Sequence, residues 1–330
     1  MRTPIRRATL ALLCACMYSA CAPPIRPTVA PQAAQQRMEE FWEDIDPSER
    51  EDLFHGVGGR RHRPDPEALY EALSKDTSGF SDGYDVVDPS GLEWSVKIGD
   101  EAQSEVAASR LVWVMGYRQP PVYYLPEWRV RHEGRVLSEG PARFRPKLPE
   151  LDNTGTWSWH QNPFVGTQPY RGLLVLMMII NSTDLKADNN ALYEHRVNGR
   201  RERWYVVKDL GASFGTTGIL NPKRNDVDEF EEHGFIEEIH DGRVEFAYRG
   251  RHQEILDDIT PDDVRWMCER LARLTDRQWR DIFRAAGHTP DVTARYTRKL
   301  REKIDEGRAF GGGASRAAGA QGPARPARNP

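Results

Sequence analysis

The stretch Asp184-Leu185-Lys186-Ala187-Asp188-Asn189, followed further along the chain by Asp209-Leu210-Gly211, decides how this sequence is interpreted. A carboxylate with a lysine and an amide nearby is suited to orienting a hydroxyl group and balancing negative charge. A second carboxylate on a short Asp-x-Gly turn is suited to holding a hard cation, which prefers oxygen ligands. The pattern therefore predicts a site that combines a general base with a divalent metal.

The segments that flank Asp184 and Asp209 predict that the two acids lie close together in the folded chain. Residues 173–180 form the most apolar run after the N-terminal leader and predict a buried helix just before Asp184. Asn198-Gly199 predicts a hairpin between residues 191–197 and 203–209. A hairpin brings its ends together, so Asn189, with Asn190 as the alternative, becomes a neighbour of Asp209. In the opposing interpretation, Asp184 caps a turn and Asp209 merely ends a strand.

An earlier part of the chain predicts a strand hairpin and a helix. Residues 84–87 and 92–98 flank the turn-forming residues 89–91. Side chains alternate along a strand, so Ser95 and Lys97 share one face, opposite the apolar face. A helix is expected over residues 101–115. On it, Glu105 is expected to face Lys97, and Glu101, one turn earlier, is the competing partner. A solvated lysine and a solvated helix face are the alternatives for these residues.

Trp94-Ser95-Val96-Lys97 is similar to the Val-Ala-Ile-Lys strand of kinases. With the Asp184 and Asp209 motifs in the same order, residues 78 to about 300 resemble the protein-kinase-like superfamily, in particular its atypical HipA-like and lipid-kinase-like members. The resemblance implies an α+β, two-lobed fold with a small β-rich N-lobe and a mainly helical C-lobe. It implies a phosphotransferase that uses ATP and Mg²⁺.

The resemblance also implies roles for single residues. Asp184 is expected to act as the catalytic base and Lys186 to stabilise the transferred phosphoryl group. Metal-binding roles fall to Asn189 and Asp209. The residues expected at the nucleotide are Lys97 on the phosphates, Glu105 as its partner, Ser95 beneath the adenine, and Gly79 and Gly83 of the loop at residues 78–84.

Several departures from the kinase pattern leave the acceptor open. The loop at residues 78–84 lacks one of the usual three glycines, and Ser182-Thr183 replaces the usual His-Arg pair. No Ala-Pro-Glu motif follows Gly211. The acceptor is therefore an unknown protein, lipid or small molecule. The alternatives are an inactive kinase-like binding or scaffold protein, and adenylyl transfer on the same fold.

The N-terminus predicts export. Arg2, Arg6 and Arg7 precede an apolar run at residues 8–17 and then small residues, which is the order of a secretory signal. Tyr18-Ser19-Ala20-Cys21 resembles a bacterial lipobox, which implies a signal peptide over residues 1–21, lipidation of Cys21 and a membrane anchor in the cell envelope. The alternative is cleavage near Ala20 or Ala30 without a lipid.

Composition sets the remaining expectations. The 330 residues carry a net charge of −4, which argues against nucleic acid as a partner. Cys268 is the one cysteine after the leader and is expected to be buried, and His160, His195 and His240 lie in no metal-ligand spacing. The predicted domains are a tether at 22–36, a helical extension at 37–77, an N-lobe at 78–150, a C-lobe at 151–307 and a disordered tail at 308–330.

Overall fold

A computed structural model describes residues 37–76, 82–218 and 222–310 of the chain. The expectations for the signal peptide, Cys21, the tether, Gly79 and the tail beyond residue 310 lie outside the described residues. None of the described helices is long and apolar enough to cross a membrane.

The first half of the chain forms a seven-stranded sheet in the order β4-β7-β3-β2-β1-β5-β6. Its core is aromatic: Trp94, Trp128, Phe144 and Tyr70 are almost fully buried and contact one another edge-on or tilted. The strands are β1 (Leu69–Asp76), β2 (Gly83–Val87), β3 (Glu93–Ile98), β4 (Tyr123–Leu125), β5 (Trp128–His132), β6 (Arg135–Glu139) and β7 (Ala142–Pro146). The predicted hairpin of β2 and β3 is confirmed.

The described residues of the predicted helical extension, 37–76, differ from that prediction. Residues 38–62 hold only four short 3-10 turns, η1 (Met38–Glu40), η2 (Pro47–Glu49), η3 (Gly56–Gly58) and η4 (Arg60–His62), and β1 belongs to the sheet. β1 pairs antiparallel with β2, the next strand along the chain, and parallel with the more distant β5, so strand pairing overrides its local pattern. Residues 122–130 hold two strands, β4 and β5, separated around Pro126.

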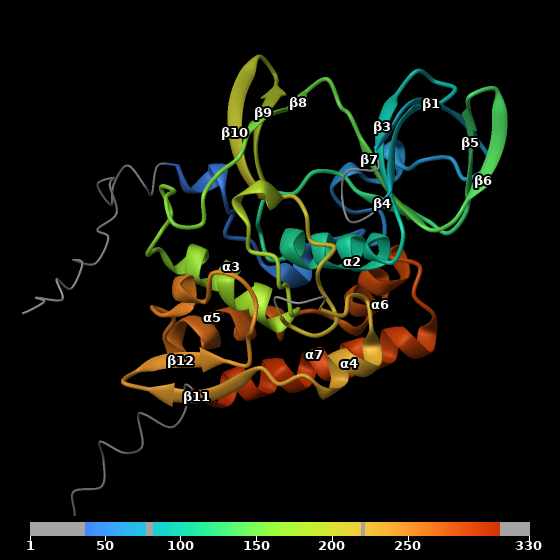
Figure 1. Ribbon diagram of the computed structural model, residues 1–330. Helices are drawn as coiled ribbons and strands as arrows, with labels where there is room; N and C mark the ends of the chain where they lie inside the picture. The colour runs from blue at the N-terminus through green and yellow to red at the C-terminus, as the bar shows by residue number, and fades with distance from the viewer. Residues whose placement is uncertain (1–36, 77–81, 219–221, 311–330) are drawn as a thin grey trace, which may run out of the picture.

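Helix α2 (Glu101–Val114) lies between the sheet and the helical part of the molecule, where the sequence predicted a helix (Figure 1). It contacts β3, β4 and β7 on one side and α6 (Asp276–Ala285) on the other, so nearly all of its residues are buried. Buried Arg110 donates hydrogen bonds to the carbonyls of Leu53, His55 and Val122. Through these bonds α2 holds the N-terminal turns against the sheet.

The second half is mainly helical. Helices α3 (Gln168–Ile179), α5 (Pro261–Leu271) and α7 (Pro290–Phe310) pack together, α4 (Val227–Glu232) contacts α7, and the hairpin β11 (Ile236–His240) and β12 (Arg243–Phe246) lies beside them (Figure 1). Thr260 and Thr275 close the capping boxes of α5 and α6. Helix α7 continues to Phe310, which corrects the boundary expected at residue 307.

A three-stranded sheet holds the predicted Asn-Gly hairpin. β8 (Leu151–Gly155), β9 (Asn190–Val197) and β10 (Arg200–Val207) are ordered β10-β9-β8. Asn198 and Gly199 both have positive φ, 51° and 76°, as the tight turn between β9 and β10 requires. The α+β class with a β-rich part and a mainly helical part is therefore confirmed.

Candidate functional site

A cleft of about 510 Å³ lies between the seven-stranded sheet and the segments around Asp184 and Asp209. It collects side chains from distant parts of the sequence. Residues of the predicted site that line it are Gly83, Ser95, Lys97, Asp184, Lys186, Asn189 and Asp209. The structure thus brings together all the described site residues except Glu105, which lies behind Lys97.

Lys97 is the centre of the cleft's charge network. It lies on β3, on the face opposite buried Trp94 and Val96, as alternation predicted. Its Nζ is 3.2 Å and 3.1 Å from Oδ1 and Oδ2 of Asp209, 2.6 Å from Oε2 of Glu101 and 3.9 Å from Oε2 of Glu105. One ammonium therefore faces three carboxylates, which come from α2 and from the turn after β10.

Glu101, the competing partner, is closer to Lys97 than Glu105 is. The reason is that Glu105 is held by β7: Nε of Arg143 lies 2.9 Å and Nη2 of Arg145 lies 2.7 Å from its Oε1. Glu105 is only 1% exposed, and its Oε2 has no hydrogen-bond partner. Glu101 also pairs with Arg224 at 2.6 Å.

The network shifts the ionisation of its members. Burial acts to lower the pKa of Lys97, but the carboxylates of Glu105, Asp209 and Glu101 outweigh it and raise that pKa. Burial acts to raise the pKa of Asp209, but the ammonium of Lys97 and the backbone N–H of Gly211 lower it overall. Both groups are therefore charged at neutral pH.

The Asp184 loop follows α3 and is fixed by backbone hydrogen bonds, including one from the N–H of Thr183 to the carbonyl of Ala212 at 3.0 Å. Lys186 Nζ is 2.9 Å from Oδ2 of Asp184. Asn189 Nδ2 donates to the carbonyl of Asp184 at 2.8 Å, and the N–H of Asp209 donates to the carbonyl of Asn189 at 3.0 Å. The hairpin thus makes Asn189 and Asp209 neighbours, as predicted.

Asn190, the alternative to Asn189, points elsewhere. It is 1% exposed and its side-chain nitrogen donates to the carbonyl of Trp157 at 3.1 Å. Gly83 pairs with Lys97 in the β2–β3 register, and a Cβ on Gly83 would lie 2.9 Å from the carbonyl oxygen of Val96. Cys268 is buried, as expected, and burial raises the pKa of its thiol to about 12.

Sequence analysis missed the arginines of the cleft. Arg143 and Arg145 alternate on β7, and their register partners on β3 are Lys97 and Ser95. The carbonyl of Ser95 accepts a hydrogen bond from Arg143 at 2.8 Å. The signal that could have found them is the Arg-x-Arg spacing, which places both guanidinium groups on one face of a strand.

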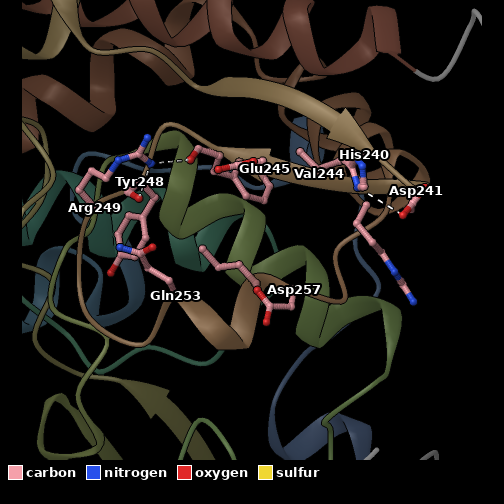
Figure 2. A pocket seen from close by; sticks show the side chains of 11 residues that line it. His240, Asp241, Val244, Glu245, Tyr248, Arg249, Gln253 and Asp257 are labelled. Carbon is pink, nitrogen blue, oxygen red and sulfur yellow. Dashed lines mark hydrogen bonds and ion pairs between the residues drawn. The ribbon is translucent and has the colours of Figure 1, made fainter. Parts of the chain in front are cut away.

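A second pocket, of about 430 Å³, holds none of the predicted site residues. It lies along β12 and the loop that follows, with His240 and Asp241 at one end and Tyr248, Arg249 and Gln253 at the other (Figure 2). The side chains of His240 and Asp241 form an exposed ion pair at 3.3 Å. The described residues of the predicted site therefore lie in and beside the cleft around Lys97 and not in this second pocket.

No protein-family model matches the chain, and no curated protein matches it. Among solved structures it is similar to a Helicobacter pylori proinflammatory kinase, CtkA, with 9% identity, a TM-score of 0.42, and coverage of 77% of this chain and 98% of that one. It is also similar to the Golgi casein kinase, at 9% identity, a TM-score of 0.41 and 86% of each chain. A structure of the Golgi casein kinase with Mn/ADP bound gives 9% identity, a TM-score of 0.37, and 75% and 73% coverage. Because these scores are low, a function has to be argued from the side chains of the cleft.

Proposed function

We propose that this protein is a phosphotransferase of the atypical kinase type, using ATP and a divalent cation in the cleft around Lys97. The observation that carries the proposal is the ion pair between Lys97 and Asp209, 112 residues apart in sequence, in one cleft with Asp184 and Asn189. An ammonium, two carboxylates and an amide are the groups that phosphoryl transfer needs, because its catalysis is mostly positioning and charge stabilisation.

In this proposal each side chain has one role. Lys97 binds the α- and β-phosphates, and the glutamates of α2 hold its ammonium in place. The Asp184 carboxylate orients the acceptor hydroxyl and accepts its proton. Lys186, 2.9 Å from Asp184, balances charge on the transferred group. Ser95 and Gly83 line the nucleotide side of the cleft.

The donor set suits a hard cation such as Mg²⁺. The Asp209 carboxylate is ionised, because Lys97 and the Gly211 N–H lower its pKa. Asn189 donates its Nδ2 to a carbonyl, so its Oδ1 is the atom left to act as a ligand. Two oxygen donors plus nucleotide phosphates are the kind of partial shell in which magnesium is held. When bound, the cation neutralises phosphate charge.

The proposal is tested by incubating the purified chain with ATP and Mg²⁺ and measuring ADP release and the intact mass of the protein and of candidate acceptors. Asp209→Asn is expected to lower turnover by about 10²-fold or more, because it removes a preorganised charge. Asp241→Asn, on the exposed β11–β12 turn, is the matched control and is expected to leave turnover unchanged.

The other possible outcomes would contradict the proposed site or favour one of the alternative functions. Unchanged turnover in Asp209→Asn would contradict the site. Nucleotide binding, seen as a rise in melting temperature, without any transfer would indicate an inactive binding or scaffold protein. An adenylate adduct in the mass spectrum would indicate adenylyl transfer. The acceptor class is read from which added protein, lipid or small molecule gains mass.

We also propose that the chain is exported and anchored to the cell envelope through a lipid on Cys21. The support is the arginine-rich start, the short apolar run and the small residues before Cys21. In a bacterial host, metabolic labelling with a fatty acid is expected to mark the full chain and not Cys21→Ser. Equal labelling of both, or label in neither, would contradict the anchor.

A further inference from the structure

Two histidines and a glutamate meet outside the cleft. Nε2 of His160 and Nδ1 of His252 each lie 3.0 Å from the same atom, Oε1 of Glu254. The imidazole rings are 5.0 Å apart between centroids and nearly perpendicular. His160 precedes α3, whereas His252 and Glu254 lie at η6 (Gln253–Leu256), so the group is assembled by the fold. The spacing of histidines along the chain gave no sign of this group, because His160 and Glu254 are 94 residues apart.

The three side chains place one ligand-type atom each close enough together for a single ion to contact all of them. The three ligand atoms all lie within 4.8 Å of one another, and no other such group occurs among the histidines, cysteines and acids of the described ranges. Two imidazoles and one carboxylate form the donor set that zinc takes in sites with an open coordination position. Imidazole nitrogen favours zinc, copper or nickel over magnesium.

Both loops are fixed without a metal. On one side, the N–H of His160 donates to Oγ of Ser158 at 3.2 Å, and Asn162 Nδ2 donates to the carbonyl of Ser158 at 3.0 Å. On the other side, the N–H of Ile255 donates to the carbonyl of His252 at 3.1 Å. An ion would therefore meet ligands already in place, and little ordering would oppose its binding.

The backbone of His252 is unusual. It has φ 56° and ψ 45°, in the left-handed region that costs a non-glycine residue conformational energy. This conformation accompanies the placement of Nδ1 beside Glu254, two residues on. The side chains of His160, His252 and Glu254 are 38%, 41% and 58% exposed, so an ion can reach them from solvent.

We propose that Nε2 of His160, Nδ1 of His252 and a carboxylate oxygen of Glu254 bind one divalent transition-metal ion of the zinc class. Water fills the coordination positions that the protein leaves open. The bound ion links the segment before α3 to the segment at η6. This site takes a borderline-soft ion on nitrogen ligands, so it is separate from the oxygen ligands of the cleft, and it stands whether or not the proposed phosphotransfer occurs.

The hydroxyl of Tyr248 links the site to the Asp184 loop. The hydroxyl of Tyr248 is 3.1 Å from the carbonyl of Thr183 and 3.0 Å from that of Arg251. Thr183 directly precedes Asp184, and Arg251 directly precedes His252. A measurable consequence of the ion is therefore slower amide hydrogen exchange in residues 250–256 than in the metal-free protein.

The test titrates the full, tag-free chain with Zn²⁺ against a chromophoric chelator, in excess Mg²⁺ to occupy hard-cation sites. His252→Asn is the main variant, because asparagine tolerates the left-handed backbone. His160→Ala and Glu254→Gln are the second and third. His240→Asn is the matched control, since His240 is an exposed histidine that pairs with Asp241 (Figure 2) and does not belong to the group.

Wild type and His240→Asn are expected to bind one more Zn²⁺ per chain than His252→Asn or His160→Ala. At free Zn²⁺ about 100-fold above Kd, the melting temperature is expected to rise by roughly 5 °C in wild type and in His240→Asn, and not in His252→Asn or His160→Ala. Equal zinc stoichiometry in wild type and His252→Asn, or an equal loss in His240→Asn, would overturn the proposal. So would a wild-type chain that binds no Zn²⁺, which would leave the group as two imidazoles hydrogen-bonded to a glutamate.

Discussion

At the scale of single residues, the cleft is a balance of buried charges. Lys97, Arg143, Arg145 and Arg224 supply positive charge, and they face the carboxylates of α2 and Asp209 at the distances given above. Removing one partner of a buried ion pair lowers the free energy of unfolding by more than the intact pair contributes, because the other charge stays buried without compensation. The two glutamates of α2 therefore differ by how deeply their partners are buried.

Glu105→Gln is expected to destabilise the protein more than Glu101→Gln. The partners of Glu105, Arg143 and Arg145, have side chains only 7% and 12% exposed, whereas Lys97 and Arg224, which pair with Glu101, are 17% and 19% exposed. We expect a loss of about 3 kcal/mol for Glu105→Gln and about 1 kcal/mol for Glu101→Gln in urea unfolding. An equal or larger loss in Glu101→Gln would contradict this ranking.

Residue-level prediction from sequence succeeded where a local period was enough. Alternation along β3 placed Lys97 and Ser95 on the cleft face. It could not identify Arg143 or Arg145, because their place beside Lys97 depends on the pairing of β7 with β3 across an intervening helix and three other strands. It also could not join His160 to His252, which lie far apart in sequence.

At the scale of elements, close packing between α3 and α5 depends on Gly172. A Cβ at this position would lie 2.3 Å from Cζ3 of Trp266, and that ring is held against Trp42 and Arg270. Helix propensity alone favours alanine over glycine by about 1 kcal/mol. Packing opposes it, because the indole would have to move from its place against Trp42 and Arg270 to make room for the methyl group.

Gly172→Ala is therefore expected to lower the free energy of unfolding by about 1–3 kcal/mol, the usual cost of overpacking. In a Trp266→Leu background the clash is removed, and the same substitution is expected to be neutral or stabilising. Denaturant unfolding of the four proteins in this double-mutant cycle measures the coupling. If the effects of the two substitutions on the free energy of unfolding simply add, the Trp266 ring is not what opposes a larger side chain at position 172.

Element prediction failed in residues 37–76 because the structure of this segment also depends on contacts with other parts of the chain. The four 3-10 turns before β1 are too short to show a helical period, and they are held by long-range bonds such as those from Arg110. β1 becomes a strand by pairing with β2 and β5. In contrast, the Asn198-Gly199 turn depends on local residues, and the sequence predicted it. The capping boxes at Thr260 and Thr275 are local in the same way.

At the scale of the whole molecule, the β-rich and helical parts meet through α2, which carries both cleft glutamates and is buried on nearly every side. A change in the stability of either part therefore affects the cleft, because both parts pack against α2. From β2 to the Asp209 turn, the two hairpins and the two helices that surround the cleft were predictable from sequence, and so was the meeting of Asn189 with Asp209. The depth of burial at the contacts between helices was not predictable from sequence. That burial determines how the stability of the fold depends on pH.

The acid stability of the fold is expected to depend on His288, between α6 and α7. Its ring contacts Phe283 and Tyr296, its Nε2 is buried without a hydrogen-bond partner, and burial lowers its pKa to about 4. An unfolded histidine has a pKa of about 6.5, so below that pH the unfolded chain binds a proton that the folded protein excludes. The stabilisation from neutral His288 is therefore present above pH 6.5 and lost as the pH falls towards 4, by about 2–3 kcal/mol.

His288→Phe removes the titrating group and keeps an aromatic ring against Phe283 and Tyr296, so its unfolding free energy is expected to fall less over this range. Urea unfolding at a series of pH values measures both slopes, and parallel slopes in the two proteins would show that other groups, such as His233, whose pKa burial also lowers, carry the acid sensitivity.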